Sequence, residues 1–272
     1  FLDQYPNLQF IQRYGVGFDN IDIEACEKKK ILFCNNPDYG VDEVSDTALS
    51  KILFLTRGLG RYKNISQNLM HDNGIWQERV IPEITRLNQQ KLLVIGAGRI
   101  GTALILKARA LFNEVTFFDP FVRSGHEKSL GCKRSFELYS AIKDADIISL
   151  NCNLDNTTRG IVDSKFIESC QSHVLIVNTA RGGLFESDEL VLQALIDGKI
   201  GGLATDVLNA EPPKRDMVRL IEQIYSENKK ELLITNHTAY YSRQSIVEMR
   251  KNAAENIKRF VLDGKYLNYV GS

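Results

Sequence analysis

The sequence lacks any long hydrophobic run. No apolar stretch approaches the roughly 18 residues that a membrane-spanning helix requires, and the first residues do not have the pattern of a signal peptide. We therefore expect no membrane segment. The sequence also lacks a charge excess, because 34 Lys and Arg residues balance 34 Asp and Glu residues. No basic surplus indicates a nucleic-acid partner, although a net charge of zero is still compatible with a local basic patch.

Cysteine is scarce and irregularly spaced. There are five cysteines, an odd number, and no two of them form a C-x-x-C motif. This pattern fits reduced thiols in the cytoplasm better than disulfides or a zinc site, so we expect no bound metal. The positions are Cys26, Cys34, Cys132, Cys152 and Cys170.

A glycine-rich motif is the most informative stretch of the chain. Residues 91–95 read as a buried strand that runs into Gly96-Ala97-Gly98-Arg99-Ile100-Gly101, and a helical pattern follows over 102–111. In such a G-x-G-x-x-G turn the first glycine permits a tight turn, the second lets the backbone approach a pyrophosphate, and the third lets the helix pack closely on the sheet. The N–H groups at the start of the helix then face the anion.

A second predicted strand, 115–118, ends at Asp119, 18 residues after Gly101. This distance is close to the roughly 20 residues expected for the acid that binds the adenosine ribose of a dinucleotide. An acid there would repel a 2′-phosphate, so the spacing favours NAD over NADP. The alternative is a glycine-rich turn without a ligand, which the combination of strand, helix and acid makes the weaker interpretation.

The pattern of strand followed by helix then repeats along the chain. Near-continuous apolar strands that alternate with helices are typical of a parallel sheet covered on both faces. We therefore predict an α/β fold with a doubly wound parallel sheet, in which ligands bind at the carboxyl ends of the strands. The six predicted strands are residues 92–95, 115–118, 146–150, 174–177, 202–205 and 232–235.

Polar residues follow these strands at the edge where ligands bind. Arg181 follows one strand, and its planar guanidinium suits a carboxylate. His237 follows another and is of the type that donates protons near neutral pH, while Glu211, in a loop stiffened by two prolines, could fix its tautomer. Asp206 could face a nicotinamide, and for Cys152 we favour packing or cofactor contact because no basic partner is visible. The alternatives are a surface arginine, a capping histidine and solvated loop acids.

The N-terminal residues predict part of a smaller domain. Residues 8–11 and 31–34 read as short strands, with a short helix over 23–30 between them. The loop 15–22 contains two glycines and either connects strand to helix or forms a backbone cradle for a small anion. The residues of this loop alone favour the simple connection.

Two longer helices flank the predicted sheet in the sequence. The first, 41–69, is interrupted by Gly58 and Gly60 and could pass from one domain to the other, with its apolar stripe in a core or a subunit interface. The second, 242–262, is amphipathic, and we expect it to return to the smaller domain. With 272 residues the chain has room for two such domains. Because it begins at Phe1 rather than Met, we expect it to be a piece of a longer protein.

Together these motifs resemble the D-isomer-specific 2-hydroxyacid dehydrogenase family, and some details lean towards its C-terminal-binding-protein-like branch. The resemblance covers nearly the whole chain. It is carried by residues 15–22, 96–101 and 178–183, by Asp206 with Glu211-Pro212, and, for the branch, by residues 237–242 and 248–250.

This resemblance implies two domains. The first is a Rossmann NAD-binding domain at 41–237, which includes the interdomain helix 41–69. The second is a smaller, flavodoxin-like substrate lobe formed by residues 1–40 and 238–272, here incomplete at its N-terminus.

The resemblance further implies a homodimeric enzyme that uses NAD to interconvert a 2-keto acid and a D-2-hydroxy acid, and the scattered cysteines predict a cytoplasmic location. It assigns catalysis to Arg181, Glu211 and His237, with Arg181 on the substrate carboxylate and the other two as the acid–base pair. Substrate binding falls to Val16, Gly17, Arg181 and His237, which makes the 15–22 loop a carboxylate cradle. The implied cofactor-binding residues are Gly96, Gly98, Arg99, Ile100, Gly101, Asp119, Cys152, Thr179, Ala180, Arg181, Asp206 and His237.

A second hypothesis comes from the same branch. The chain could be an NADH-sensing dimeric scaffold with little or no turnover, similar to the corepressors of that branch. Tyr240 stands where those corepressors carry Trp, and the Arg–Glu–His set is retained, so we rank the scaffold behind the enzyme. Fold alone cannot decide between the two.

Overall fold

The computed structural model describes residues 2–68, 76–227 and 229–271. The chain divides into two compact units, one formed by Phe1–Glu43 with Tyr240–Ser272 and the other by Val44–Ala239. Among the described residues no helix is both long and apolar enough to cross a membrane. Each unit is described separately below.

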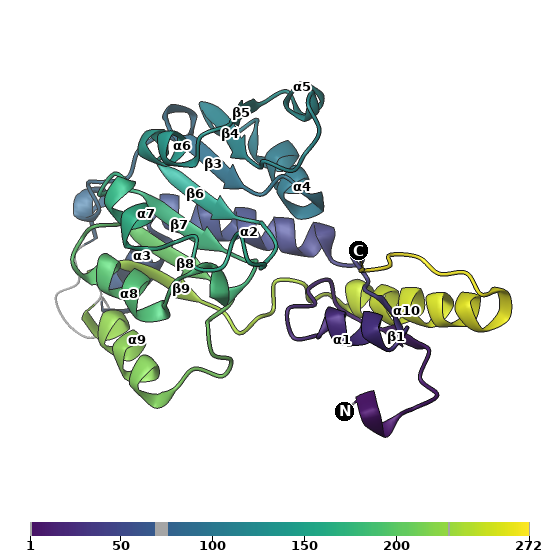
Figure 1. Ribbon diagram of the computed structural model, residues 1–272. Helices are drawn as coiled ribbons and strands as arrows, with labels where there is room; N and C mark the ends of the chain where they lie inside the picture. Colours follow the sequence, from purple (N-terminus) through teal and green to yellow (C-terminus); the bar gives the residue numbers. More distant parts are fainter. Residues whose placement is uncertain (1, 69–75, 228, 272) are drawn as a thin grey trace. The chain divides into compact units, whose positions relative to one another are not determined.

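The larger unit is built on a seven-stranded sheet in which all neighbouring strands run parallel (Figure 1). The order β5-β4-β3-β6-β7-β8-β9 shows that the chain winds from β3 to one edge, returns, and winds from β6 to the other. This confirms the predicted doubly wound α/β fold. The strands are β3 (Lys91–Ile95), β4 (Glu114–Phe118), β5 (Lys133–Ser135), β6 (Ile147–Leu150), β7 (Leu175–Asn178), β8 (Gly202–Thr205) and β9 (Glu231–Ile234).

One strand of this sheet, β5, escapes the sequence pattern. It consists of Lys133, Arg134 and Ser135, three polar residues that pair with β4 at the edge of the sheet. An edge strand has one face and one side open to water, so it needs no apolar run. The six strands that were predicted from apolar runs are all present.

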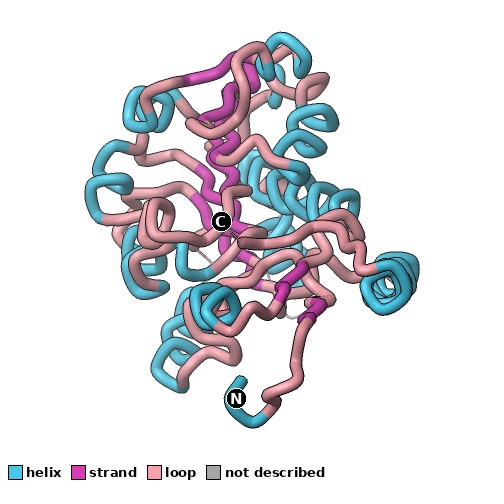
Figure 2. The backbone as a smooth tube through the Cα atoms, turned by 45° about the vertical axis from the view of Figure 1, so that its right-hand side comes forward, coloured by secondary structure: helices cyan, strands magenta, loops and turns pink. Residues whose placement is uncertain are grey.

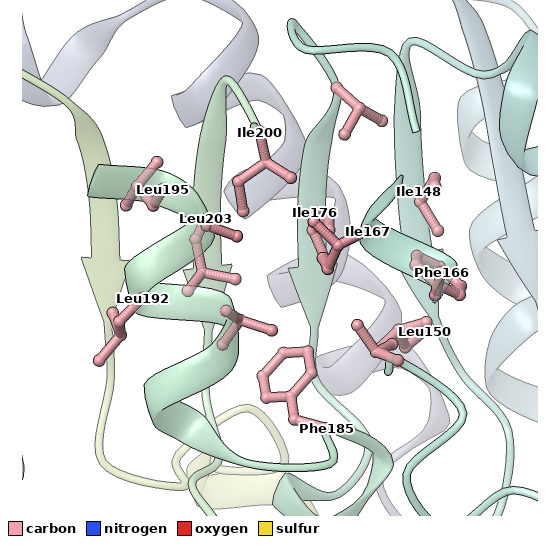
Figure 3. Close-up of a cluster of buried hydrophobic side chains, with 14 of the residues drawn as sticks. Ile148, Leu150, Phe166, Ile167, Ile176, Phe185, Leu192, Leu195, Ile200 and Leu203 are labelled. Atoms are coloured by element: carbon pink, nitrogen blue, oxygen red, sulfur yellow. The ribbon is translucent and has the colours of Figure 1, made fainter. Parts of the chain in front are cut away.

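Helices cover both faces of the sheet, as Figures 1 and 2 show. Because successive side chains on a strand point to opposite faces, Leu93 and Ile95 pack with α6–α9, whereas Leu92 and Val94 pack with α2 and α4. Figure 3 shows the first of these cores, in which side chains from α7 and α8 meet those of β6, β7 and β8. The helices of this unit are α2 (Val41–Thr56, which begins in the smaller unit), α3 (Leu59–Asn68), α4 (Arg99–Ala108), α5 (His126–Leu130), α6 (Leu138–Asp144), α7 (Ser164–Ser169), α8 (Asp188–Ile196) and α9 (Arg215–Glu227), with 3-10 turns at Glu78–Val80, Leu87–Gln89 and Gly182–Leu184.

The predicted helix over 41–69 is two helices, because α2 ends at Thr56 and α3 begins at Leu59, with the break at one of the two glycines that interrupt the pattern. Gly58 between them has a φ of +59°, a left-handed conformation that ends a helix. The carboxylate of Glu231, at the start of β9, accepts a hydrogen bond from the Arg61 backbone N–H at 3.1 Å and so caps the first turn of α3. The last residue of the predicted helix lies outside the described residues.

The smaller unit contains a two-stranded parallel sheet and a long C-terminal helix. Strand β1 (Phe10–Gln12) pairs with β2 (Leu32–Cys34), and α1 (Ile23–Lys28) connects them after a short 3-10 turn at Leu2–Gln4. Helix α10 (Arg243–Asp263) begins with a reciprocal capping box between Ser242 and Ser245. The ring of Phe260 in α10 stacks on Phe10 of β1 at 4.5 Å between ring centroids, so both ends of the chain contribute to this unit.

Candidate active site and cofactor-binding loop

The glycine-rich turn joins β3 to α4 and has little room for side chains at two of its three glycines. Gly96 has a φ of +92°, and a Cβ there would lie 2.5 Å from the backbone nitrogen of Cys152. A Cβ on Gly101 would lie 1.9 Å from the carbonyl oxygen of Gly96, so α4 packs directly on the turn. At Gly98, by contrast, nothing lies within 4 Å of the Cβ position. The turn is therefore tight where it packs and open where a pyrophosphate would approach.

Asp119 lies beside this turn, as the sequence spacing predicts. Its carboxylate accepts a hydrogen bond from the backbone N–H of Ala97 at 2.9 Å and another from the backbone N–H of Phe121 at 2.9 Å. Arg134 of β5 donates to the Asp119 backbone carbonyl at 2.7 Å. An acid anchored in this way next to the open side of Gly98 suits the ribose of a dinucleotide.

Two buried polar atoms at the strand ends have no hydrogen-bond partner among the described residues. They are the Thr179 hydroxyl, which follows β7, and the Asn151 side-chain oxygen, which follows β6. Buried polar groups are rarely left unpaired, so both atoms are available to bind a ligand at this edge of the sheet. Together with the open position at Gly98, they fit a bound NAD.

Cys152 lies between these features but is not suited to nucleophilic catalysis. Burial raises the pKa of its thiol to about 12, so the thiol stays protonated at neutral pH. Its backbone packs against Gly96. All five cysteines of the chain are free thiols.

Arg181 is held in a loop that the Asn178 side chain shapes. The Asn178 amide accepts from the Ala180 backbone N–H at 3.0 Å and donates to the Arg181 carbonyl at 2.9 Å, which fixes the turn after β7. A Cβ on the next residue, Gly182, would lie 2.1 Å from the Leu208 carbonyl, so the loops after β7 and β8 touch backbone to backbone. The Arg181 guanidinium donates to the Ala180 carbonyl at 2.8 Å.

The structure brings His237 and Glu211 together although 26 positions separate them in the chain. Nδ1 of the imidazole lies 2.6 Å from a carboxylate oxygen of Glu211, whose other oxygen accepts from the Leu208 backbone N–H at 3.1 Å. Both side chains are about 40% exposed, at 41% and 39%, so the pair is open to a substrate. A carboxylate on Nδ1 fixes the proton there and leaves Nε2 to exchange a proton with a reacting group.

The backbone of His237 is held in an unusual conformation. Its φ is +54°, which is uncommon for a residue with a Cβ, and its N–H donates to the Asp206 carbonyl at 2.7 Å. The next two residues donate their backbone N–H groups to the Asp206 carboxylate, Thr238 at 3.1 Å and Ala239 at 2.7 Å. Asp206 itself is 1% exposed. The structure thus gives Asp206 an anchoring role, while its predicted contact with the nicotinamide stays a prediction.

Two buried charged residues that support the site were not predicted. Asp188, at the start of α8, accepts from the Asn209 backbone N–H at 2.9 Å and so ties down the loop that carries Glu211. Burial raises the pKa of the Asp188 carboxyl. Lys51 in α2 is 2% exposed and donates to the Thr235 hydroxyl at 2.8 Å and to the Thr205 carbonyl at 3.3 Å.

A sequence signal for Lys51 does exist. The buried side of α2 includes positions 44, 48, 51 and 55, a helical spacing that places a lysine in an apolar stripe. A charged residue at such a position must find a partner inside the protein. No comparable pattern marks Asp188, which resembles an ordinary acid in the first turn of a helix.

The predicted substrate residues Val16 and Gly17 lie in the smaller unit. The Asn35 amide, which follows β2, donates to the Val16 carbonyl at 2.7 Å, and the Asn36 backbone N–H donates to the Gly15 carbonyl at 3.2 Å. These bonds hold the glycine-containing loop against the end of β2. The role of Val16 and Gly17 in substrate binding stays a prediction.

Residues 49–239 match the family model described as D-isomer specific 2-hydroxyacid dehydrogenase, NAD binding domain. The chain belongs to this family. The matched range contains the glycine turn, Asp119 and the Arg–Glu–His loops, so the larger unit is an NAD-binding domain of the 2-hydroxyacid dehydrogenase type.

Curated relatives cover most of this dehydrogenase-family chain. It is 33% identical to C-terminal-binding protein 1 of Caenorhabditis elegans over 96% of its length and 32% identical to D-3-phosphoglycerate dehydrogenase of Methanocaldococcus jannaschii over 82%. The matched regions span 35% and 41% of those two proteins, so the chain covers less than half of the length of each.

Solved structures of the family agree with the fold. The D-lactate dehydrogenase from Aquifex aeolicus, crystallised with NAD and lactic acid, superposes with a TM-score of 0.86 at 29% identity and covers all of this chain and 83% of its own. The D-mandelate dehydrogenase of Rhodotorula graminis gives a TM-score of 0.84 at 26% identity, with 98% of this chain and 76% of its own covered.

Proposed function

We propose that this protein is an NAD-dependent oxidoreductase that interconverts a 2-keto acid and a D-2-hydroxy acid. The observation that carries the proposal is the hydrogen bond of 2.6 Å between His237 and Glu211, on adjacent loops at the carboxyl ends of β8 and β9 in an NAD-binding domain. A histidine oriented by a carboxylate is suited to exchange a proton at an alcohol or carbonyl oxygen.

In this proposal His237 donates a proton from Nε2 to the carbonyl oxygen of the keto acid during reduction and accepts it back during oxidation. Glu211 keeps the proton on Nδ1 and stabilises the charged imidazolium that forms when Nε2 is also protonated. Bound NAD supplies or accepts the hydride, and the protein positions the reacting groups.

Arg181 binds the substrate carboxylate and polarises the neighbouring carbonyl. Its guanidinium can present two N–H groups to two carboxylate oxygens, which orients the acid as well as holding it. Val16 and Gly17 are also proposed as substrate-binding residues, by resemblance to the family.

The proposed NAD contacts follow from the fit of the turn and the strand ends. Gly98 and the start of α4 receive the pyrophosphate, Asp119 receives the adenosine ribose, and Thr179 offers its unpaired hydroxyl near the nicotinamide. The remaining proposed contacts are Gly96, Arg99, Ile100, Gly101, Cys152, Ala180, Arg181, Asp206 and His237.

The substrate class is a small 2-hydroxy or 2-keto acid. This is supported by the similarity to D-lactate and D-mandelate dehydrogenases, both at 26% identity or more. A homodimer in the cytoplasm, with no nucleic acid or membrane as partner, completes the proposal.

The second candidate is an NADH-sensing scaffold with little or no turnover. The observation that favours it is the similarity to C-terminal-binding protein 1 over 96% of this chain. In that case the same site would bind NADH, and the functional output would be association with a protein partner.

The deciding experiment follows NADH oxidation with a panel of 2-keto acids, in the full-length protein and its variants. We expect turnover that falls about 10²- to 10⁴-fold in His237→Gln while NADH affinity is retained. His173→Gln is the matched control, because His173 also pairs with a carboxylate, Asp146 at 2.7 Å, but before β7 at the opposite end of the strands.

The outcomes separate the two candidates. Turnover that is lost in His237→Gln and kept in His173→Gln supports the dehydrogenase, and Arg181→Met should then raise KM for the acid and lower kcat. Tight NADH binding without turnover on any acid would overturn the dehydrogenase and favour the scaffold. A His237→Gln protein that folds, binds NADH and keeps its turnover would contradict the proton-transfer role.

A further inference from the structure

The larger unit contains a buried lysine that the proposed reaction does not use. Lys51 lies in α2 with 2% of its surface exposed, and burial lowers the pKa of its amine to about 8. Among the described residues of this unit, it donates to the Thr205 carbonyl and to the Thr235 hydroxyl. An ammonium group in such a place is costly unless an anion is close.

That anion is the carboxylate of Asp206, and Thr235 connects the two. The Thr235 hydroxyl accepts a hydrogen bond from Lys51 and donates one to the Asp206 carboxylate. Burial lowers the pKa of Lys51, and the negative charge of Asp206 partly opposes that lowering. The result is a buried lysine and a buried carboxylate linked through one hydroxyl group.

The other end of this network is the backbone around His237. The Asp206 carboxylate accepts the backbone N–H groups of Thr238 and Ala239, and the Asp206 carbonyl accepts the N–H of His237. His237 has a positive φ, a conformation that a residue with a Cβ adopts only when its surroundings enforce it. The three bonds to Asp206 hold this conformation, and two of them, from Thr238 and Ala239, depend on an Asp206 carboxylate that stays in place.

We propose that Lys51 is a positioning residue for His237, which acts through Thr235 and Asp206 without touching substrate or cofactor. Its positive charge compensates the buried carboxylate, so that this carboxylate can keep the two N–H groups that follow His237. Without the Lys51 charge, the Asp206 carboxylate lowers its free energy by moving towards water. The loop then relaxes from the left-handed conformation at His237. The imidazole then loses its alignment with Glu211.

The loss of turnover expected on substitution of Lys51 rests on the proposed function. The expected change in the loop that carries His237 does not depend on it. A misplacement of about 1 Å at a catalytic group can cost about 10²-fold in rate. We therefore expect Lys51→Met to lower kcat about 10- to 100-fold, with the KM for the keto acid changed less than about threefold.

The test compares three variants of the full-length protein. Lys51→Met removes the charge and keeps the length of the side chain, and Thr235→Val removes only the bridging hydroxyl. Lys107→Met is the matched control, because Lys107 also reaches α2, where it pairs with Asp46 at 2.7 Å on the partly exposed side. If Lys51→Met does not fold, Thr235→Val still tests the link between Lys51 and Asp206.

The main readout is the nitrogen-15 spectrum of the imidazoles in the protein without cofactor, which reports which ring nitrogen carries the proton. The chain has only four histidines, and His237→Gln assigns the relevant signal. We expect the hydrogen-bonded Nδ1–H signal of His237 to be weakened or lost in Lys51→Met and Thr235→Val and unchanged in Lys107→Met.

Each outcome is decisive. An unchanged His237 signal in a folded Lys51→Met or Thr235→Val protein overturns the proposal, and so does an equal effect of Lys107→Met. Absence of turnover in the unsubstituted protein overturns the dehydrogenase proposal only, because the imidazole spectra still report whether Lys51 positions His237.

Discussion

The two halves of the candidate site are built by different means. The glycine turn after β3 is made of backbone, and its properties depend on where side chains are missing. The Arg–Glu–His loops after β7, β8 and β9 are made of side chains, and they depend on interior residues such as Asp188, Asp206 and Lys51. A backbone site can be specified by a short local motif, whereas a side-chain site requires partners from distant parts of the chain.

The largest effect on NADH affinity should come from a substitution in the glycine turn after β3. In Gly101→Ala the new Cβ would lie 1.9 Å from the Gly96 carbonyl oxygen, so α4 must move away from the turn. We expect NADH affinity to fall more than about 100-fold and Tm to fall by several degrees, as for other overpacked sites. Calorimetric titration and a thermal melt measure both, and a native Tm with native NADH affinity would contradict the packing argument.

A sharper test of the same half is Gly98→Ala. The structure leaves space around this Cβ, and the φ of −70° is compatible with alanine, so the fold should be unaffected. The added methyl group would occupy the approach of the pyrophosphate, and we expect NADH affinity to fall about 10- to 100-fold with Tm changed by less than about 3 °C. Equal losses of Tm in Gly98→Ala and Gly101→Ala would remove the distinction between the open and packed glycines.

The titration of Lys51 should make the stability of the protein depend on pH. Below about pH 8 the lysine is protonated in the folded and the unfolded protein, so stability does not depend on its titration. Between about 8 and its ordinary value of 10.5 the unfolded chain still binds the proton that the folded protein has released, so stability rises with pH. The free energy of unfolding relative to Lys51→Met should rise by about 2 kcal/mol from pH 7 to pH 9.5. Urea titrations at each pH measure this difference, and a flat or falling difference would contradict a depressed pKa for Lys51.

The smallest effect should come from Cys152, which lies between the two halves. Its thiol is buried and protonated, so Cys152→Ser should change kcat and NADH affinity less than about threefold. Alkylation of the native protein at neutral pH should leave this thiol largely unmodified, as mass spectrometry of the peptides would show. Rapid alkylation with loss of turnover would instead indicate a reactive cysteine.

The same contrast explains how much could be predicted from the sequence. The apolar runs and the G-x-G-x-x-G turn predicted the sheet, its winding and the place of Asp119, because each of these depends on local pattern. The two glycines marked an interruption between α2 and α3, but the cap of α3 was missed because its carboxylate comes from Glu231, 170 positions away from Arg61. Strand β5 was missed because an edge strand can be polar. The candidate site residues were proposed from their place after strands, whereas the hydrogen bonds among Asp188, Asp206 and Lys51 and the loops they support could not be predicted from local pattern.

Asp119 has a consequence for attempts to change the cofactor preference. Replacing an acid at this position is the obvious route towards acceptance of a 2′-phosphate, because it removes a repelling charge. In this protein the same carboxylate also receives the Ala97 and Phe121 N–H groups, and Ala97 is part of the glycine turn. A neutral replacement without an acceptor would therefore leave two backbone donors unmatched and loosen the phosphate-binding turn. The two N–H groups reach different oxygens of the carboxylate, so Asp119→Asn or Asp119→Ser would keep an acceptor for only one of them. Redesign of cofactor selectivity here therefore has to supply the second acceptor from another side chain before any basic residue is introduced.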